Sequence, residues 1–423
     1  MHFDQREQFT SRRYRVLALL FFVITICILD RQVLSVVAPL LREKFHLSNT
    51  QYGEILFCFL AGMTFGQVPA GIMMDRLGPR FTFILIVSIW SLANAAHIWM
   101  GTIVQFCCLR FILGLAESGA YSGGTKVIAQ YFDPKDRAVA GGIFNSGSLV
   151  GAILAPPLVV FLTLHYGWRK SFLLPSIAGM AWIIPWTLIY KRPACRSSGM
   201  NVIHISQREQ KILPLLAIPS VWGVILMRAF AAPVTNFYWY WLPEYFLHKR
   251  GVSFSTLGTL SWLPFLAGGI GNIGGGWCSS HLIQRGVPIP AARKRVIIAS
   301  IALAGTALIA PLLENTALAI GCICIASLGI NSFAANLIAV MTDTFPENYL
   351  ARITSFTGVG DGLVSMAVML LTGIVVDHFS YAPVFAAIGL LPLLSLAAYL
   401  RLVSKTSLQS HGHQISGLVD EGH

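Results

Sequence analysis

Residues 14–38 read YRVLALLFFVITICILDRQVLSVVA. A helix needs roughly 20 mostly apolar residues to cross the hydrocarbon core of a bilayer, and this run is long enough. The rest of the chain has the same character, because 55% of its 423 residues are hydrophobic and 11% are charged. An ordinary soluble domain has about 25% charged residues. The composition therefore excludes a water-soluble enzyme, a disordered chain and a disulfide-stapled secreted module.

Eleven further apolar spans follow the first, and together they predict an all-α membrane protein of twelve transmembrane helices. They lie near residues 52–74, 81–100, 103–130, 137–162, 170–191, 221–247, 255–279, 294–313, 316–344, 351–376 and 381–402. The only long hydrophilic interior stretch separates the sixth span from the seventh. We therefore expect an N-terminal six-helix bundle, a cytoplasmic connector, a C-terminal six-helix bundle and a cytoplasmic tail at 1–191, 192–220, 221–402 and 403–423.

Basic residues indicate which side of the membrane each loop faces. Twelve spans place both termini on one side, and 20 of the 30 Lys and Arg residues lie on that side, against six in the opposite loops. Because cytoplasmic loops carry the excess of Lys and Arg, both termini are predicted to be cytoplasmic. The net charge of +12 then reflects topology and does not indicate a nucleic-acid partner. The absence of an Asn-x-Ser/Thr site from the sequence favours a bacterial inner membrane.

The two halves of the chain repeat each other. A shift of 205 residues aligns LSNTQYG at Leu47–Gly53 with VSFSTLG at Val252–Gly258, and Gly71 with Gly276. Some secondary transporters are built from two parallel halves of this kind, with the binding site near the bilayer midplane where the halves meet. The alternative is a chance alignment of apolar segments.

The loop after the second span carries the strongest local motif, GIMMDRLGPR at Gly71–Arg80. It resembles the Gly-x-x-x-Asp-Arg-x-Gly-x-Arg signature of the major facilitator superfamily. The glycines permit a tight turn, and Asp75 could lie at the N-terminus of a neighbouring helix, where the helix dipole favours an anion. We therefore expect a cytoplasmic gate made of Asp75, Arg76 and Arg80. A solvated charged turn is the alternative.

Four residues are the clear cases of ionisable groups inside the spans, where each costs about 2.5–3.5 kcal/mol at the bilayer centre. Asp30 and Arg31 are in the first span, and Arg110 and Glu117 are in the fourth. Arg110 and Glu117 are two helical turns apart and share one face, whereas Asp30 and Arg31 point roughly 100° apart. These groups indicate either a functional site or a purely structural ion-pair network.

A closer resemblance rests on DRQVLSVVAPLLREKFHLSNTQYG at Asp30–Gly53, GLAESG at Gly114–Gly119, and YWLPEYF together with GWR. These segments are similar to the anion:cation symporter branch of the superfamily, and within it to bacterial hexuronate and aldarate carriers. The resemblance implies proton-driven uptake of a sugar-acid anion, such as a hexuronate, by alternating access. Arg31 would then hold the substrate carboxylate, and Asp30 and Glu117 would carry protons. Arg110 would pair with Glu117 when that carboxylate is ionised.

Further polar residues at pocket depth suit a polyol ring, because amides and hydroxyls offer hydrogen bonds and aromatic faces pack on C–H groups. The substrate-binding candidates are Asn145, Ser148, Tyr238, Asn331 and Asn336. For Asn145 and Ser148 close helix packing explains the small polar residues equally well. Met63 and Ser148 depart from the sugar-acid relatives, which leaves the sugar itself open. Arg228 and Asp361 form either a gate pair or two separate groups that reach the cytoplasmic headgroups, and the second is favoured.

The remaining patterns indicate no cofactor, no metal and no enzyme. The eight cysteines form no Cys-x-x-Cys pair and have no His partners at zinc spacing. A Gly-x-Gly-x-x-Gly at Gly269–Gly274 lies inside a span and follows no strand, so it lacks the context of a dinucleotide site. We expect a monomer in the lipid bilayer whose partners are a small organic anion and protons.

Two alternatives stay open. A proton-coupled exporter of organic or lipophilic compounds would use a wide apolar pocket, which two buried arginines do not favour. A transporter-like membrane sensor would be expected to add a soluble signalling domain, for which the connector and the tail leave no room.

Overall fold

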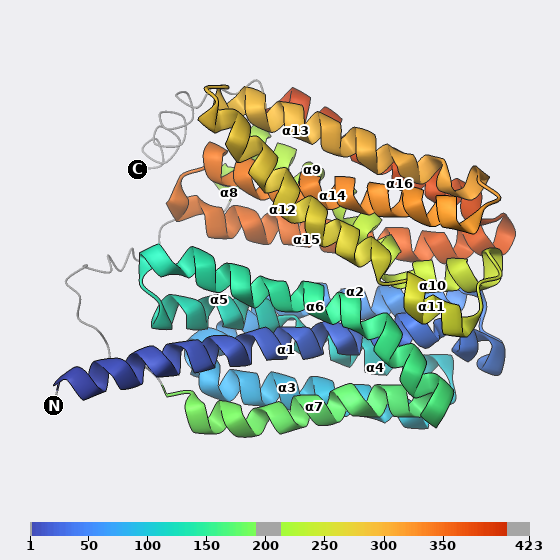
Figure 1. The fold of residues 1–423 in the computed structure, drawn as a ribbon, viewed down its shortest axis with the longest axis horizontal. Coiled ribbons are helices and arrows are strands. Elements are labelled where there is room, and N and C mark those ends of the chain that lie inside the picture. Colours follow the sequence, from blue (N-terminus) through green and yellow to red (C-terminus); the bar gives the residue numbers. More distant parts are fainter. Residues whose placement is uncertain (1, 192–212, 404–423) are drawn as a thin grey trace. The chain divides into compact units, whose positions relative to one another are not determined.

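The computed structural model describes residues 2–191 and 213–403, and every regular element within these two ranges is a helix (Figure 1). Most of the predicted connector and nearly all of the predicted tail lie outside the described residues. The chain divides into two compact units. Unit 1 consists of Met1–Pro193, Asn236–Leu266 and Met366–Val384, and unit 2 consists of Ala194–Thr235, Ala267–Ser365 and Phe385–His423. The predicted division into two six-helix bundles stays a prediction.

Unit 1 contains the helices of the first six spans and several short elements. These are α1 (His2–Phe45), α2 (Asn49–Arg76), α3 (Gly78–Ala96), η1 (His97–Trp99), α4 (Ile103–Glu117), α5 (Gly119–Tyr131), α6 (Pro134–Tyr166), α7 (Trp168–Ile189), α10 (Leu242–Glu244), η2 (Tyr245–Lys249) and α11 (Phe254–Leu260). The fourth predicted span is divided between α4 and α5 at Ser118, directly after Glu117.

Unit 2 contains α8 (Leu213–Leu216), α13 (Ile289–Ala304), η3 (Gly305–Leu308), η4 (Ala310–Leu312), α14 (Thr316–Thr344) and η5 (Tyr399–Val403). Four long helices contribute residues to both units. They are α9 (Pro219–Tyr240), α12 (Leu263–Gln284), α15 (Glu347–His378) and α16 (Tyr381–Ala398).

Ten helical segments within the described residues are long and apolar enough to cross a membrane. The two other predicted spans correspond to α9 and α12, which have 22 residues each. At 1.5 Å per residue such a helix is about 33 Å long, which matches the hydrocarbon core. Their sequences are less apolar, because α9 carries Arg228 and Asn236 and α12 is rich in glycine. The prediction of an all-α membrane fold is confirmed.

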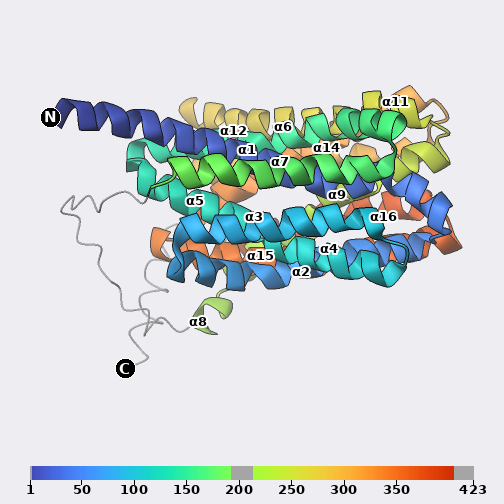
Figure 2. The same cartoon turned by 90° about the horizontal axis from the view of Figure 1, so that it is seen from below.

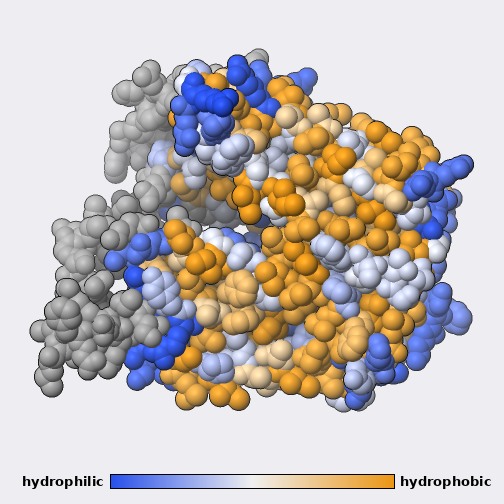
Figure 3. Space-filling model, viewed as in Figure 1, coloured by the Kyte–Doolittle hydropathy of each residue, from blue (hydrophilic) through white to orange (hydrophobic). Residues whose placement is uncertain are grey.

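The distribution of side chains on the surface agrees with a membrane environment. On the face drawn in Figure 3, hydrophobic residues cover the middle of the helices of each unit, and hydrophilic residues gather near the helix ends. Many of the exposed residues are large and apolar, among them Phe22, Phe65, Leu188 and Ile273. Such a surface would be poorly soluble in water but is suited to lipid.

Local sequence signals set the ends of α1 and α2. The chain leaves α1 at His46, whose φ of 52° is left-handed and ends the helix. Ser48 then caps α2, because its hydroxyl accepts a hydrogen bond from the Gln51 amide and the Gln51 side chain accepts one from the Ser48 amide. We call this end of unit 1, where α1 ends and α2 begins, the distal end.

Close backbone contacts fix how the helices of unit 1 pack. The helix α1 contacts α6 and α7, α3 contacts α4 and α7, and α2 contacts α4 (Figure 2). A methyl group on Gly114 of α4 would overlap the carbonyl oxygen of Phe59 on α2, and one on Gly62 would overlap that of Phe111. Small residues at such crossings let membrane helices approach closely. This crossing places Phe59 of α2 beside α4.

We predict that Gly114→Ala lowers the free energy of unfolding by about 1–3 kcal/mol, because the added methyl group forces α2 and α4 apart. Thermal unfolding of the purified protein would measure the effect. Gly142→Ala is the matched control, since a methyl group there meets no atom within 4 Å. Equal melting temperatures for the two variants would contradict the proposed close contact.

Candidate functional site

The four ionisable residues predicted inside the first and fourth spans lie together in unit 1. We call Asp30, Arg31, Arg110 and Glu117 the charged cluster. Asp30 and Glu117 are completely buried, Arg110 is 2% exposed, and the Arg31 side chain is 12% exposed. The break between α4 and α5 at Ser118 adjoins Glu117. Buried charges of this kind need partners, because an isolated charge in an apolar interior is very costly.

Glu117 takes its ion-pair partner from α1. The Nε and Nη2 atoms of Arg31 donate to Oε2 of Glu117 at 3.1 and 3.0 Å. Nη2 of Arg31 also lies 3.7 Å from the sulfur of Met63. The sequence analysis expects Arg110 to be the partner of Glu117. In the structure the partner is instead Arg31. The reason is geometric: the Arg31 side chain reaches across from α1 to the end of α4, whereas Arg110 lies two turns earlier on α4.

Arg110 has donors that are not used. Its Nε and Nη2 atoms are buried and have no hydrogen-bond partner among the described residues. Its guanidinium carbon lies 6.0 Å from the centre of the Phe59 ring, and that of Arg31 lies 5.4 Å from the same ring. An aromatic face attracts cations, so Phe59 stabilises both guanidinium groups without neutralising either. These two groups of Arg110 could therefore donate hydrogen bonds to an anionic ligand.

Asp30 is held by an amide and not by a cation. Nδ2 of Asn94, on α3, donates to Oδ1 of Asp30 at 2.5 Å, while Oδ2 is buried without a partner among the described residues. The same amide nitrogen lies 3.1 Å from the carbonyl oxygen of Phe172 and 3.2 Å from Oγ of Ser176. Sequence reasoning missed Asn94, although an amide inside the third span, close to the end of α3, was the available signal.

Other predicted candidates in unit 1 have different surroundings. Ser148 shares a hydrogen bond of 2.7 Å with the hydroxyl of Tyr121. Asn145 is exposed, and Tyr238 is 2% exposed with no hydrogen-bond partner for its hydroxyl among the described residues. Tyr121 was not predicted. It follows Glu117 by four residues, a spacing that brings side chains to one helix face when a helix continues.

In unit 2 the two candidate asparagines donate to backbone carbonyls. Asn331 donates to Ser327 of its own helix at 2.9 Å. Asn336 is completely buried and donates to Ser332 at 3.0 Å and to Gly275 of α12 at 3.1 Å. The contacts of Asn336 are typical of helix packing. A role of either residue in substrate binding stays a prediction.

A second ion pair lies in unit 2. Arg228 donates to Asp361 at 3.2 Å, and Ser365 donates to the other carboxylate oxygen at 3.0 Å. We had favoured two separate groups that reach the headgroups, and that prediction is wrong. Their helices, α9 and α15, lie more than a hundred residues apart in sequence, so spacing could not reveal the contact.

The predicted cytoplasmic gate residues lie at the turn between α2 and α3. Gly78 has a φ of 77°, which permits the tight turn. Asp75 pairs with Lys126 of α5 at 2.6 Å, and Arg80 donates to the carbonyl oxygen of Thr187 at 2.9 Å. Arg76 is exposed. The role of these residues as a gate stays a prediction.

The net charge of the four side chains in the charged cluster can link the binding of an anion to the binding of protons. With both carboxylates ionised, two positive and two negative charges cancel. Protonation of either carboxylate leaves one excess positive charge, which then favours an anion. Within the described residues no group of three His, Cys, Asp or Glu side chains is placed to hold a metal ion.

We predict that Arg31→Met destabilises the protein by about 3 kcal/mol, because Glu117 is left buried without its cation. Adding Glu117→Gln should recover most of the loss, since position 117 then no longer carries a buried charge without its partner. Thermal unfolding of the single variants and of the double variant gives the coupling between the two sites. Strictly additive effects would contradict a direct ion pair.

Comparison with known proteins agrees with this architecture. The sequence profile of the Major Facilitator Superfamily matches residues 20–292 and 291–416. The chain is 27% identical over 414 residues to a hexuronate transporter of Escherichia coli K12, covering 94% of this chain and 95% of the relative. It is 24% identical to a D-galactonate transporter of Escherichia coli O6:H1 over 413 residues, covering 93% and 96%.

A solved structure shares the fold. The crystal structure of a D-xylose-proton symporter superposes with a TM-score of 0.74 at 15% sequence identity, covering 94% of this chain and 98% of that one. The family profile extends over most of the sequence, and the helices have the length and composition of membrane spans. The chain belongs to the Major Facilitator Superfamily, and it is a membrane transporter and not an enzyme.

Proposed function

We propose that this protein imports a sugar-acid anion, such as a hexuronate, together with protons. The observation that carries the proposal is the charged cluster, in which two buried guanidinium groups lie beside two buried carboxyl groups. The names of the hexuronate and D-galactonate transporters among its relatives support an anionic sugar as the substrate. An anionic substrate gives a reason to keep two cations inside the membrane, where burying each of them is costly.

In this proposal the substrate carboxylate and Glu117 compete for Arg31. When Glu117 is ionised, it holds Arg31 through two hydrogen bonds to one oxygen. A proton on Glu117 removes the charge that holds Arg31, and the guanidinium can then bind the substrate carboxylate. Arg110, with its two free donors, adds a second contact for the anion. Proton and anion therefore bind together, which is the requirement of a symporter.

Asp30 is the second proton carrier in the proposal. Its carboxyl group is completely buried, and its hydrogen-bond donor is the neutral amide of Asn94. An ionised carboxylate without a cation in contact is very costly in such surroundings. Two protons and one monovalent anion together carry one net positive charge inward, for which the membrane potential supplies about 2.3 kcal/mol at 100 mV, enough for nearly 50-fold accumulation.

The proposal includes an orientation of the protein in the membrane. The excess of Lys and Arg in the loops on the side of the termini supports a cytoplasmic position for both termini. The distal end of unit 1 would then face outward. We propose a bacterial inner membrane as the location and a monomer as the working form.

We predict that glucuronate, galacturonate, galactonate or glucarate raises the melting temperature of the purified protein, whereas the uncharged parent sugars do not. Arg31→Ala should remove this shift, because the carboxylate loses its cation. Arg295→Ala, at an exposed arginine of α13, is the control and should keep the shift. A shift with the parent sugars of equal size would refute the proposed recognition of the carboxylate.

We further predict that Glu117→Gln abolishes proton-driven accumulation in vesicles but keeps counterflow exchange. The amide cannot release a proton, so the anion and the proton gradient are no longer coupled. Glu314→Gln, at an exposed acidic residue, should behave as the wild type. Uphill uptake by the Glu117→Gln variant would remove Glu117 from the coupling mechanism and leave Asp30 to be tested as Asp30→Asn.

A further inference from the structure

Three polar residues on one face of unit 1 are completely buried. They are Ser91 and Asn94 of α3 and His97, which follows α3 and begins η1. Their spacing of three residues places them one above another along the helix. A polar side chain at such depth is costly unless its atoms have hydrogen-bond partners. The packing of apolar helices alone does not account for this face.

His97 uses one ring nitrogen and leaves the other without a partner. Nδ1 lies 2.8 Å from the carbonyl oxygen of Ala93, and because a carbonyl only accepts, Nδ1 carries the hydrogen. In the neutral ring Nε2 is then an acceptor, and it is buried without a partner among the described residues. The ring stacks on Phe172 at 5.0 Å and packs edge-on with Phe106 at 6.4 Å. A structural role at the end of α3 explains Nδ1 and the ring but not Nε2.

Asn94 connects this face to the charged cluster. Its side-chain nitrogen donates to Oδ1 of Asp30 at 2.5 Å, and His97 follows it by three residues, a rise of about 4.5 Å along the chain. The charge of Arg110 acts on both Asp30 and the His97 ring. Oδ2 of Asp30, Oδ1 of Asn94, and Nε and Nη2 of Arg110 are buried without partners in the part of the chain that the structure describes. These atoms lie on α1, α3 and α4.

Internal water is the usual partner of buried polar atoms of this kind. A buried water molecule makes about three hydrogen bonds to groups that would otherwise lack partners. Here the carboxylate of Asp30 and Nε2 of His97 accept, and the guanidinium of Arg110 donates, so water among them can bond to groups of both kinds. A chain of water and titratable side chains also conducts protons.

His97 lies between this group of atoms and the distal end of unit 1. Its neighbour Phe106 packs against Phe45, the last residue of α1, with ring centres 5.7 Å apart. Five residues after His97 the chain reaches Thr102, which is exposed and caps α4. The imidazole is therefore placed to receive protons from the distal side and to pass them toward Asp30.

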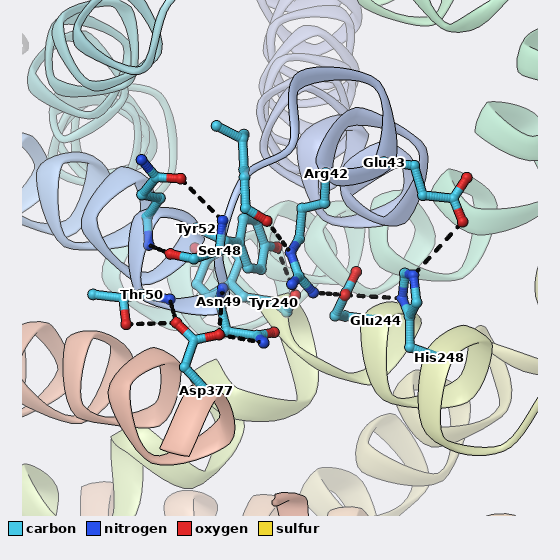
Figure 4. Close-up of polar contacts among 12 residues, drawn as sticks. Arg42, Glu43, Ser48, Asn49, Thr50, Tyr52, Tyr240, Glu244, His248 and Asp377 are labelled. Carbon is cyan, nitrogen blue, oxygen red and sulfur yellow. Dashed lines mark hydrogen bonds and ion pairs between the residues drawn. The ribbon is translucent and has the colours of Figure 1, made fainter. Parts of the chain in front are cut away.

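Other titratable groups at the distal end are engaged with partners (Figure 4). Asp377 of α15 accepts four hydrogen bonds of 2.7–2.9 Å from the first two residues of α2. Glu244 pairs with Arg42, and Nδ1 of His248 lies 2.9 Å from the same carboxylate oxygen. Nε2 of His97 differs from these groups, because it is buried and has no partner among the described residues.

We propose that His97 is a proton relay for Asp30, and that water between α1, α3 and α4 connects the two side chains. Nε2 takes a proton from the distal side and releases it through water to Oδ2 of Asp30, while Nδ1 keeps its hydrogen. The ring is therefore neutral before and after the transfer. Asp30 exchanges its proton inside unit 1, along a path that does not use Arg31, the proposed anchor of the anion. The inference rests on the proposed proton symport and adds a residue to it.

Proteoliposomes that hold the full-length protein and a pH-sensitive dye test the relay. The substrate is whichever of glucuronate, galacturonate, galactonate and glucarate the wild type takes up fastest. His97→Asn keeps a donor at the place of Nδ1 but cannot titrate, so we expect proton uptake at least about tenfold slower. Counterflow exchange of the labelled sugar acid should be kept, because it needs no net proton transfer.

His165→Asn is the matched control. Nδ1 of His165 lies 2.9 Å from the carbonyl oxygen of Phe161, four residues earlier, as Nδ1 of His97 does with Ala93, but His165 is exposed. This variant should take up protons as the wild type does. A slowing equal to that of His97→Asn would overturn the relay, because loss of the backbone contact would then explain both.

His97→Ala gives a second measurement, since it removes the ring and makes room for free imidazole. Added imidazole should restore part of its proton uptake and should leave His97→Asn unchanged. Equal losses of proton uptake and counterflow in His97→Asn, without rescue of His97→Ala, would overturn the relay and make His97 structural. Proton uptake that His97→Asn leaves at the wild-type rate would overturn the relay alone. Sugar-acid uptake by the wild type without protons would overturn the symport and the relay together.

Discussion

The ion pair between Arg31 and Glu117 is the interaction on which the proposed transport mechanism depends. It places a cation and an anion together between membrane-spanning helices, and two donors of Arg110 beside it have no partner among the described residues. A structural ion-pair network would satisfy every member, because unpaired buried charges are costly. Here three of the four members, Asp30, Arg110 and Glu117, have a buried polar atom without a partner among the described residues, which is the condition expected of a binding site before its ligand arrives.

The helix α2 connects the charged cluster to the distal end. One of its faces crosses α4 at Gly62 and carries Phe59 to the two arginines. Near its start, Gly53 contacts α15. Because α2 is one continuous helix from Asn49 to Arg76, the same element forms both contacts.

Individual elements show how far sequence reasoning reached. The apolar spans predicted the long helices, because a lipid environment imposes a length and a composition that can be counted locally. The break after Glu117 was not predicted, since Ser118 and Gly119 occur in intact membrane helices as well. The pair formed by Arg228 and Asp361 was predicted as two separate groups, because hydropathy carries no information on which way each helix is rotated.

The sequence by itself determined that this is a membrane transporter of the major facilitator type and which ionisable residues are held inside its spans. Both conclusions follow from local composition and from a short motif. Only the tertiary structure decided the partners: Arg31 for Glu117, Asn94 for Asp30 and the start of α2 for Asp377. Each of these contacts joins helices far apart in sequence, and a rotation of one helix by a single residue, about 100°, would have changed it.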